Sequence, residues 1–217
     1  MARMKFICDA ERCIECNGCV TACKAEHDVP WGVNRRRVVT LNDGVPGERS
    51  ISVACMHCSD APCMAVCPVD CFYRTDEGVV LHDKDVCIGC GYCSYACPFG
   101  APQFPTNGTF GLRGKMDKCT FCAGGPEANG SQAEWEKYGR NRLAEGKLPA
   151  CAEMCSTKAL LGGEGNVLAD IYRERVTNRG KGGDVWGWAT AYGRPEAPKQ
   201  PGTPAGVPAA PAGGPKS

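Results

Sequence analysis

Cysteine is the residue type in this chain whose abundance and spacing could do chemistry. Of the 217 residues, 18 are Cys, and all but Cys8 and Cys71 fall into four groups with short internal spacings. The groups are Cys13-x2-Cys16-x2-Cys19-x3-Cys23; Cys55-x2-Cys58-x4-Cys63-x3-Cys67; Cys87-x2-Cys90-x2-Cys93-x3-Cys97; and Cys119-x2-Cys122 followed, after residues 123–150, by Cys151-x3-Cys155. The chain therefore repeats one metal-binding unit.

Disulfides, zinc and iron–sulfur clusters are the three common uses of so many cysteines. A C-x2-C-x2-C loop wraps three corners of a cubane, and in two-cluster ferredoxins the Cys three residues further on ligates the other cluster. Zinc sites use C-x2-C pairs with longer gaps and often His, but none of His27, His57 and His82 has such a spacing. The pattern predicts [4Fe-4S] clusters in pairs that exchange ligands. Cys8 and Cys71, outside the pattern, are expected to be small buried hydrophobes rather than ligands.

Motifs for substrate chemistry are missing from the sequence. There is no G-x-G-x-x-G fingerprint, no P-loop and no evident nucleophile–base arrangement. We therefore predict no catalytic residues and an electron-transfer protein in place of an enzyme. A catalytic iron–sulfur enzyme, which usually has an open iron site, is the less favoured alternative.

The composition sets further bounds. Aromatic residues make up only 7% of the chain, so the apolar core should be thin and the cysteines should help to hold the fold. The formal net charge is +1, and nothing indicates nucleic acid. The N-terminus lacks the apolar segment of a secretory signal, and no stretch approaches the length of a membrane span. We expect Arg35, Arg36 and Arg37 to form a solvated or partner-facing edge instead of a phosphate-binding patch.

Short elements must position the cysteine loops. We expect strands at 5–8 and 51–54, a hairpin from 72–74 and 79–81, and short helices at 19–26 and 62–66. An insertion at 123–148 should contain a helix near 132–138, and apolar periodicity predicts an amphipathic helix at 166–178. The Pro/Ala/Gly-rich end is predicted to be an irregular tail.

Two cysteine segments resemble known proteins. CMAVCPVDCFY at 63–73 and CIGCGYCSYACPF at 87–99 are similar to bacterial dicluster ferredoxins. The order of the four groups over residues 5–180 resembles the four-cluster iron–sulfur subunits of molybdenum or tungsten oxidoreductases. CKAEHDVPWGVNRRRV, ACMHCSDAPCMAVCP and KMDKCTFCAGG are most similar to the beta subunits of respiratory formate dehydrogenases.

The resemblance implies an α+β, double bacterial-ferredoxin-like (dicluster) fold with crossed ligation. Residues 1–50 and 106–183 would form a split first module, residues 51–105 an inserted second module, and residues 184–217 the tail. The implied ligand sets are set 1 (Cys13, Cys16, Cys19, Cys155), set 2 (Cys23, Cys119, Cys122, Cys151), set 3 (Cys55, Cys58, Cys63, Cys97) and set 4 (Cys67, Cys87, Cys90, Cys93). Lys24 follows Cys23 where the ferredoxin pattern has Pro, a departure within set 2.

The resemblance also implies a function. Four [4Fe-4S] clusters would carry electrons from a molybdopterin-type catalytic alpha subunit that oxidises formate to a membrane cytochrome b-type subunit or a soluble acceptor. The same role in a sulfur-compound or nitrate reductase, or a stand-alone polyferredoxin, is the alternative. Export together with the catalytic partner would place the complex on the periplasmic side of the inner membrane; cytoplasmic residence is the other possibility.

Overall fold

The computed structural model describes residues 3–107, 112–126 and 131–178, so the predicted tail at 184–217 lies outside the described residues. The elements follow in this order: β1 (Met4–Cys8), α1 (Gly18–His27), β2 (Arg36–Leu41), β3 (Arg49–Ala54), α2 (Pro62–Ala65), β4 (Phe72–Arg74), β5 (Val80–His82), α3 (Tyr92–Ala96), β6 (Thr106–Asn107), β7 (Leu112–Arg113), α4 (Gln132–Tyr138), α5 (Ala150–Glu153), β8 (Leu160–Glu164) and α6 (Gly165–Asn178). The mixture of short strands and short helices agrees with the α+β class. None of these described helices is long and apolar enough to cross a bilayer.

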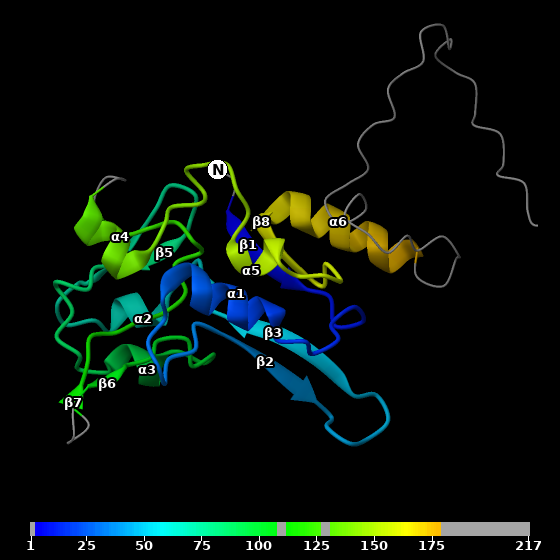
Figure 1. Ribbon diagram of the computed structural model, residues 1–217, viewed down its shortest axis with the longest axis horizontal. Coiled ribbons are helices and arrows are strands. Elements are labelled where there is room, and N and C mark those ends of the chain that lie inside the picture. The colour runs from blue at the N-terminus through cyan, green and yellow to red at the C-terminus, as the bar shows by residue number, and fades with distance from the viewer. Residues whose placement is uncertain (1–2, 108–111, 127–130, 179–217) are drawn as a thin grey trace, which may run out of the picture.

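The two ends of the described chain meet in one small sheet. β1 pairs antiparallel with β8, and Phe6 lies opposite Gly162. Glycine is needed there because a Cβ at position 162 would approach the Phe6 ring to 2.8 Å. The predicted amphipathic helix is confirmed as α6, which packs Leu168 and Ile171 onto this sheet. Figure 1 shows α6 beside β8 and β1, with α5 and α1 on the other side.

The expected strand at 51–54 belongs to a longer hairpin. β2 and β3 pair antiparallel from Arg36 opposite Ala54 to Leu41 opposite Arg49. The hairpin projects away from the helices in Figure 1, and its second strand runs directly into Cys55. The hairpin thus fixes where the second cysteine group begins.

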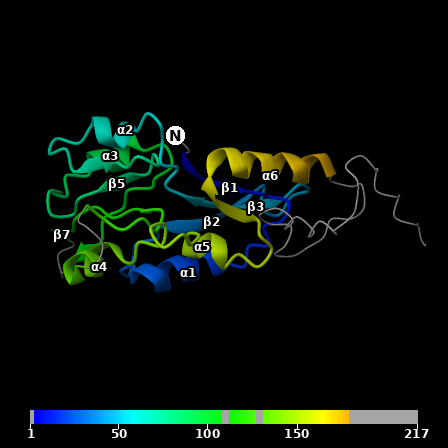
Figure 2. The ribbon, with the colours of Figure 1, turned by 90° about the horizontal axis from the view of Figure 1, so that it is seen from above.

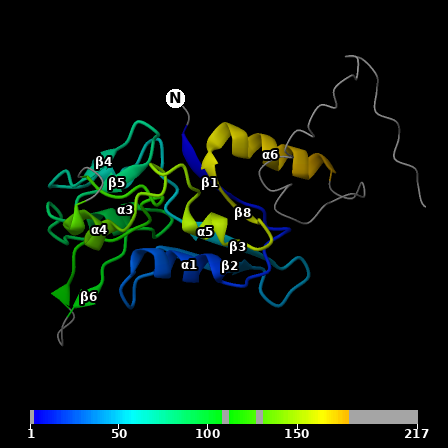
Figure 3. The ribbon, with the colours of Figure 1, turned by 45° about the horizontal axis from the view of Figure 1, so that its top comes forward.

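A second hairpin and two short helices form the other end of the molecule. β4 and β5 pair antiparallel, as predicted for this region, with the second strand one residue later than expected. α2 begins at Pro62, whose fixed φ suits the first turn of a helix. Figures 1 and 2 show α2, α3 and β5 together at the end of the molecule opposite α6, and Figure 3 shows β4 beside β5 there.

The apolar interior is divided into five small clusters, and cysteines belong to three of them. Phe6 contacts three of the clusters, and its ring lies 4.3 Å from that of Phe121. The prediction of a thin core is therefore confirmed among the described residues. Phe6 is the side chain that links its parts.

The arginine triplet departs from expectation. Arg35 and Arg36 are only 4% and 2% exposed, so the prediction of a solvated edge is wrong for both. Arg35 forms a bidentate pair with the buried Asp117, and Arg36 lies over the Phe6 ring at 4.3 Å. Arg37 is half-buried and donates to the carbonyl of Gly100. Both faces of the hairpin are covered at its base, so alternation along the strand does not bring either buried arginine to solvent.

Candidate metal centres

Set 3 gathers around one cavity. Its four cysteines come from the end of β3, the following loop, α2 and the end of α3, and all of them line this cavity: Cys55, Cys58, Cys63 and Cys97. The rest of the wall is largely apolar, with Ala61 and Val80, but it also includes the fully buried Lys118. Three thiols from the second cysteine group and one from the third therefore face a common space.

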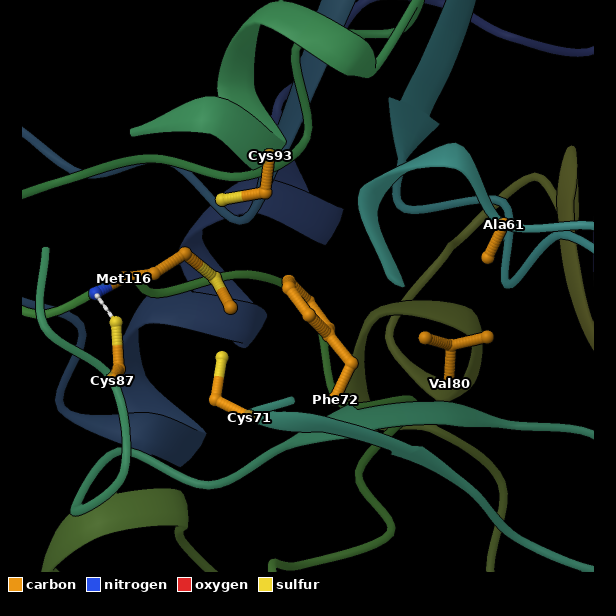
Figure 4. Packing of buried hydrophobic residues seen from close by; sticks show 7 residues of the cluster. All are labelled: Ala61, Cys71, Phe72, Val80, Cys87, Cys93 and Met116. Carbon is orange, nitrogen blue, oxygen red and sulfur yellow. Dashed lines mark hydrogen bonds between the residues drawn. The ribbon is translucent and has the colours of Figure 1, made fainter. Parts of the chain in front are cut away.

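Set 4 surrounds a second cavity. Its four cysteines line this cavity together with Phe72, Ile88 and Phe104: Cys67, Cys87, Cys90 and Cys93. Figure 4 shows Cys87, Cys93 and Cys71 grouped around Met116, whose backbone N–H donates to the Cys87 sulfur at 3.4 Å. Here one thiol from the second group joins three from the third, the complement of set 3.

The set 2 cysteines approach one another from the first and fourth groups. Burial raises the pKa of the Cys23 thiol to about 12, and the nearby Cys119 and Cys151 raise it further. Burial also raises the pKa of Cys122, with Cys151, Cys119 and Cys23 acting in the same direction. α1 packs against α5, and this contact brings Cys23 to Cys151.

Set 1 is assembled more loosely. Cys19 and Cys155 pack in one apolar cluster with Cys8. Burial raises the pKa of Cys8, and the nearby Cys13 and Cys155 thiols raise it further. Cys16 is exposed. The structure thus brings three of the set 1 cysteines together and leaves the fourth at the surface.

Contacts between sets give them a linear order. Cys151 of set 2 packs in one apolar cluster with Cys19 of set 1. Cys119 of set 2 packs with Cys55 of set 3, and Cys63 of set 3 packs against the cluster that contains Cys93 of set 4. The order is therefore 1, 2, 3, 4, with the exposed Cys16 at one end and the exposed Cys90 at the other.

The backbone of the first and third cysteine loops repeats the same conformation. Glu15 and Asn17 have φ values of 57° and 56°, and the equivalent Gly89 and Gly91 have 71° and 88°. Left-handed residues at these two positions turn the chain around the space between the thiols. Gly18 is the first residue of α1, and a Cβ there would meet only the Cys16 sulfur, at an ordinary 3.6 Å.

The thiols are poor nucleophiles but suitable ligands. Burial raises the pKa of Cys119 and of Cys63 to about 11, and that of Cys93 to about 12. Catalytic cysteines have lowered values, whereas soft metals bind the thiolate and offset its cost. In the part of the chain that the structure describes, no three His, Cys, Asp or Glu side chains converge tightly enough for a single ion. A cubane spreads its four ligands over a whole cluster, and the sets fit that group.

Sequence reasoning missed three residues beside the sets. His27 directs Nε2 at the Cys122 sulfur (3.1 Å) and Nδ1 at the carbonyl of Tyr138 (3.0 Å), so Nδ1 carries the proton when the ring is neutral. Burial lowers the pKa of His27 to about 4. The other two are the buried cations Lys118 and Arg36. His27 ends α1, after Cys23, Lys118 directly precedes Cys119, and Arg36 begins β2. No motif in the sequence links these residue types to the cysteine sets.

The two spare cysteines lie close to the sets. Cys71 is buried as expected, lines the set 4 cavity, and has its sulfur 3.5 Å from that of Cys67. Cys8 is half-buried and accepts a hydrogen bond from the Ser52 N–H at 3.2 Å.

Comparison with known proteins points the same way. Residues 49–137 match the family model of a 4Fe-4S dicluster domain. The chain is 64% identical over 194 residues to a formate dehydrogenase iron-sulfur subunit of Wolinella succinogenes, covering 88% of this chain and 97% of that protein. It is 38% identical to a thiosulfate reductase electron transfer subunit of Salmonella typhi (70% and 71% covered). It is also 36% identical to one subunit of an anaerobic dimethyl sulfoxide reductase of Escherichia coli (71% and 70% covered).

The family model covers the second and third cysteine groups, and the Wolinella succinogenes protein is matched over 88% of this chain. The chain carries iron–sulfur clusters, has no catalytic role of its own, and works with a catalytic subunit. It belongs to the family of iron–sulfur electron-transfer subunits found in formate dehydrogenase and related reductases.

Proposed function

We propose that this chain carries four [4Fe-4S] clusters and conducts electrons away from a catalytic subunit that oxidises formate at a pterin-bound molybdenum or tungsten. The observation that carries the proposal is the gathering of cysteines from different groups, best seen where sets 3 and 4 line two separate cavities. Identity of 64% to a formate dehydrogenase subunit, against 38% and 36% to subunits of two other reductases, favours formate.

The clusters, when bound, supply reversible one-electron transfer, while the protein fixes their positions and surroundings. The residues that would hold them are the sixteen cysteines of sets 1 to 4. Apolar side chains line the cavities of sets 3 and 4, including Ala61 in the first and Phe104 in the second, while Cys90 leaves one corner of set 4 exposed. The paired strands β1 and β8 pack beside the cysteines of sets 1 and 2. This arrangement supports a double dicluster fold with a second module, residues 51–105, inserted into a first.

The ends of the linear order are the proposed points of electron entry and exit. Cys16 and the 63% exposed Ile14 lie at the set 1 end, and Cys90 and the 65% exposed Ile88 lie at the set 4 end. An exposed cluster edge with an apolar neighbour suits close contact with another redox subunit. We propose that one end receives electrons from the catalytic subunit and that the other serves a membrane cytochrome b-type subunit or a soluble acceptor. The proposed location is the periplasmic side of the inner membrane.

Affinity purification under anaerobic conditions tests the assignment. The tagged chain should bring down a large pterin-containing subunit, and the complex should reduce a dye with formate. A complex that is active only with thiosulfate, dimethyl sulfoxide or nitrate would replace formate with that substrate. Isolation of the chain alone, with its iron bound, would make it a diffusible polyferredoxin.

Serine substitutions test the crossed ligation. Cys63→Ser and Cys97→Ser, in different cysteine groups, should perturb the electron paramagnetic resonance (EPR) signal of the same cluster, because both belong to set 3. Cys67→Ser, in the same group as Cys63, should perturb a different one. Cys8→Ser is the matched control and should leave all four signals. If Cys63→Ser and Cys67→Ser affect one cluster while Cys97→Ser affects another, the ligands are not crossed.

A further inference from the structure

Arg36 is a fully buried cation at the base of the β2–β3 hairpin. Its side chain is 2% exposed, its backbone pairs with Ala54 immediately before Cys55, and its guanidinium lies 4.3 Å above the Phe6 ring. The Phe6 ring packs in turn against Cys55 and Cys119. Arg36 therefore lies deep among the cysteine sets and far from the solvated edge expected for it.

No carboxylate neutralises this charge. Among the described residues Arg36 has no ion pair, and its Nη1 donates a hydrogen bond to the Ser52 hydroxyl at 3.0 Å. Its Nε and Nη2 are buried and have no partner in the part of the chain that the structure describes. The adjacent Arg35 is different, because Asp117 binds it with two hydrogen bonds of 2.9 and 2.8 Å. Since an unpaired charge is very costly to bury, the compensation for Arg36 must come from a group bound nearby.

The surroundings of Arg36 identify that group as the clusters of sets 1 and 2. Burial alone would lower the pKa of the guanidinium, but nearby thiolates raise it, in the order Cys151, Cys119, Cys19 and Cys23. Cys19 belongs to set 1 and the other three to set 2. The Ser52 hydroxyl that accepts from Arg36 also lies 3.2 Å from the Cys19 sulfur, which joins the cation to set 1 through one side chain.

We propose that Arg36 is a fixed countercharge shared by the clusters of sets 1 and 2, and that it raises the midpoint potentials of both. The physical reason is that reduction adds an electron to an already anionic thiolate cluster. A buried cation that cannot lose its proton stabilises the reduced form more than the oxidised form, and local charge is one of the factors that set such potentials. This inference rests on the proposed function and assigns a positioning role to a residue that binds no iron.

Charge-removing and charge-preserving variants separate this role from packing. Arg36→Gln removes the charge and retains a polar group within reach of Ser52, whereas Arg36→Lys retains the charge. Arg173→Gln removes an exposed arginine of α6, 75% exposed at its side chain, and serves as the matched control. Each variant is purified as the anaerobic complex, its iron is counted, and its clusters are titrated with EPR detection at set potentials.

At the wild-type midpoint, Arg36→Gln should lower the reduced-to-oxidised ratio of two clusters about tenfold, equivalent to about −59 mV for a one-electron couple. In Arg36→Gln, the reduced-to-oxidised ratios of the clusters of sets 3 and 4 should change less than threefold. In Arg36→Lys and Arg173→Gln, the ratios of all four clusters should change less than threefold. Cys→Ser variants of sets 1 and 2 identify which signals belong to which clusters. If Arg36→Gln does not load iron, the Arg36→Lys titration decides. Reduced-to-oxidised ratios within threefold of the wild-type values support the role of charge, and a tenfold change in these ratios contradicts it.

Unchanged potentials in a fully loaded Arg36→Gln protein would overturn the inference, and so would an equal shift of all four clusters. Neither result would affect the proposed function, which depends on about sixteen iron atoms and four signals in the wild-type chain. A wild-type chain with fewer clusters would instead contradict the proposed function itself.

Discussion

Asp117→Asn should loosen the cluster-bearing fold without touching a ligand. Arg35 and Asp117 are both 2% exposed at their side chains, and Lys84 adds a third charge 3.3 Å from Asp117. Burial alone would raise the pKa of Asp117, but Arg35 and Lys84 hold it below its ordinary value. The carboxylate is therefore ionised in the fold and neutralises a buried guanidinium.

The cost follows from leaving Arg35 without that partner. Removing one member of a buried ion pair typically costs about 3–5 kcal/mol. Cluster loss is irreversible, so the measurable quantity is a rate and not an equilibrium free energy. If about half of the cost acts on the unfolding barrier, cluster loss should accelerate by about ten- to sixty-fold, because 1.4 kcal/mol is a factor of ten.

The assay follows the visible absorption of the clusters in the anaerobic complex at fixed temperature, with an iron chelator present. Asp170→Asn is the control, since its pair with Arg173 is exposed and such pairs contribute about 0–1 kcal/mol. We expect less than a threefold change for the control. The double variant Arg35→Met/Asp117→Asn should lose clusters more slowly than Asp117→Asn alone, because it leaves no arginine unpaired. If Asp117→Asn behaves like the control, the pair does not support the fold as argued.

Three further changes test other parts of the structure. Gly162→Ala places a Cβ 2.8 Å from the Phe6 ring, and this overpacking should cost about 1–3 kcal/mol; an unchanged rate of cluster loss would show that Phe6 yields freely. Burial and the nearby Lys118 lower the pKa of His82 well below its ordinary value, so the imidazole is neutral in the fold. The unfolded chain takes up a proton at this side chain below pH ~6.5, so the stability that neutral His82 contributes above that pH is lost as the pH falls. Wild-type cluster loss should therefore accelerate between about pH 6.5 and 5, and His82→Phe should accelerate less; equal acceleration would exclude His82 as the cause. Ser131→Ala removes the acceptor for the Glu134 N–H at the start of α4 and should weaken that helix by about 0.5–2 kcal/mol, seen as faster hydrogen exchange in α4 with all clusters retained; unchanged exchange would contradict the capping role.

The cysteine groups and most short elements could be predicted from sequence because their determinants are local. Ligand spacing, the turn at Gly78 and the apolar period of α6 each depend on a few neighbouring residues, and the structure places β4, β5 and α6 within one residue of expectation. The linear order of the sets depends on packing between distant segments. It needs contacts such as Cys119 with Cys55, and spacing carries no information about them.

The arginine triplet shows a second limit of sequence reasoning. Three consecutive charges in a strand usually indicate a solvated face, and this prediction failed because two unrelated partners cover the hairpin at its base. Asp117 reaches Arg35 from the segment after β7, and Phe6 reaches Arg36 from β1. The first pairing is recognisable only once the fold is known. The second makes physical sense only with anionic clusters nearby, a factor that residue type does not encode.

Iron removal should unfold the described domain, because burying its cysteine ligands and unpaired cations costs free energy that the bound clusters offset. Without iron, burial holds thiols such as Cys119 and Cys93 in their protonated form, and Arg36 and Lys118 stay buried with no carboxylate among their described contacts. Thiolate coordination removes the first cost, and the negative charge of the clusters offsets the second. We therefore expect anaerobic chelation to abolish near-ultraviolet circular dichroism and to expose the amides of β2 and β3 to hydrogen exchange. Reconstitution with iron and sulfide should restore both signals together. An iron-free chain that kept its near-ultraviolet spectrum and its protected β2–β3 amides would show that the apolar clusters suffice, and that the buried cations are neutralised by protein groups instead.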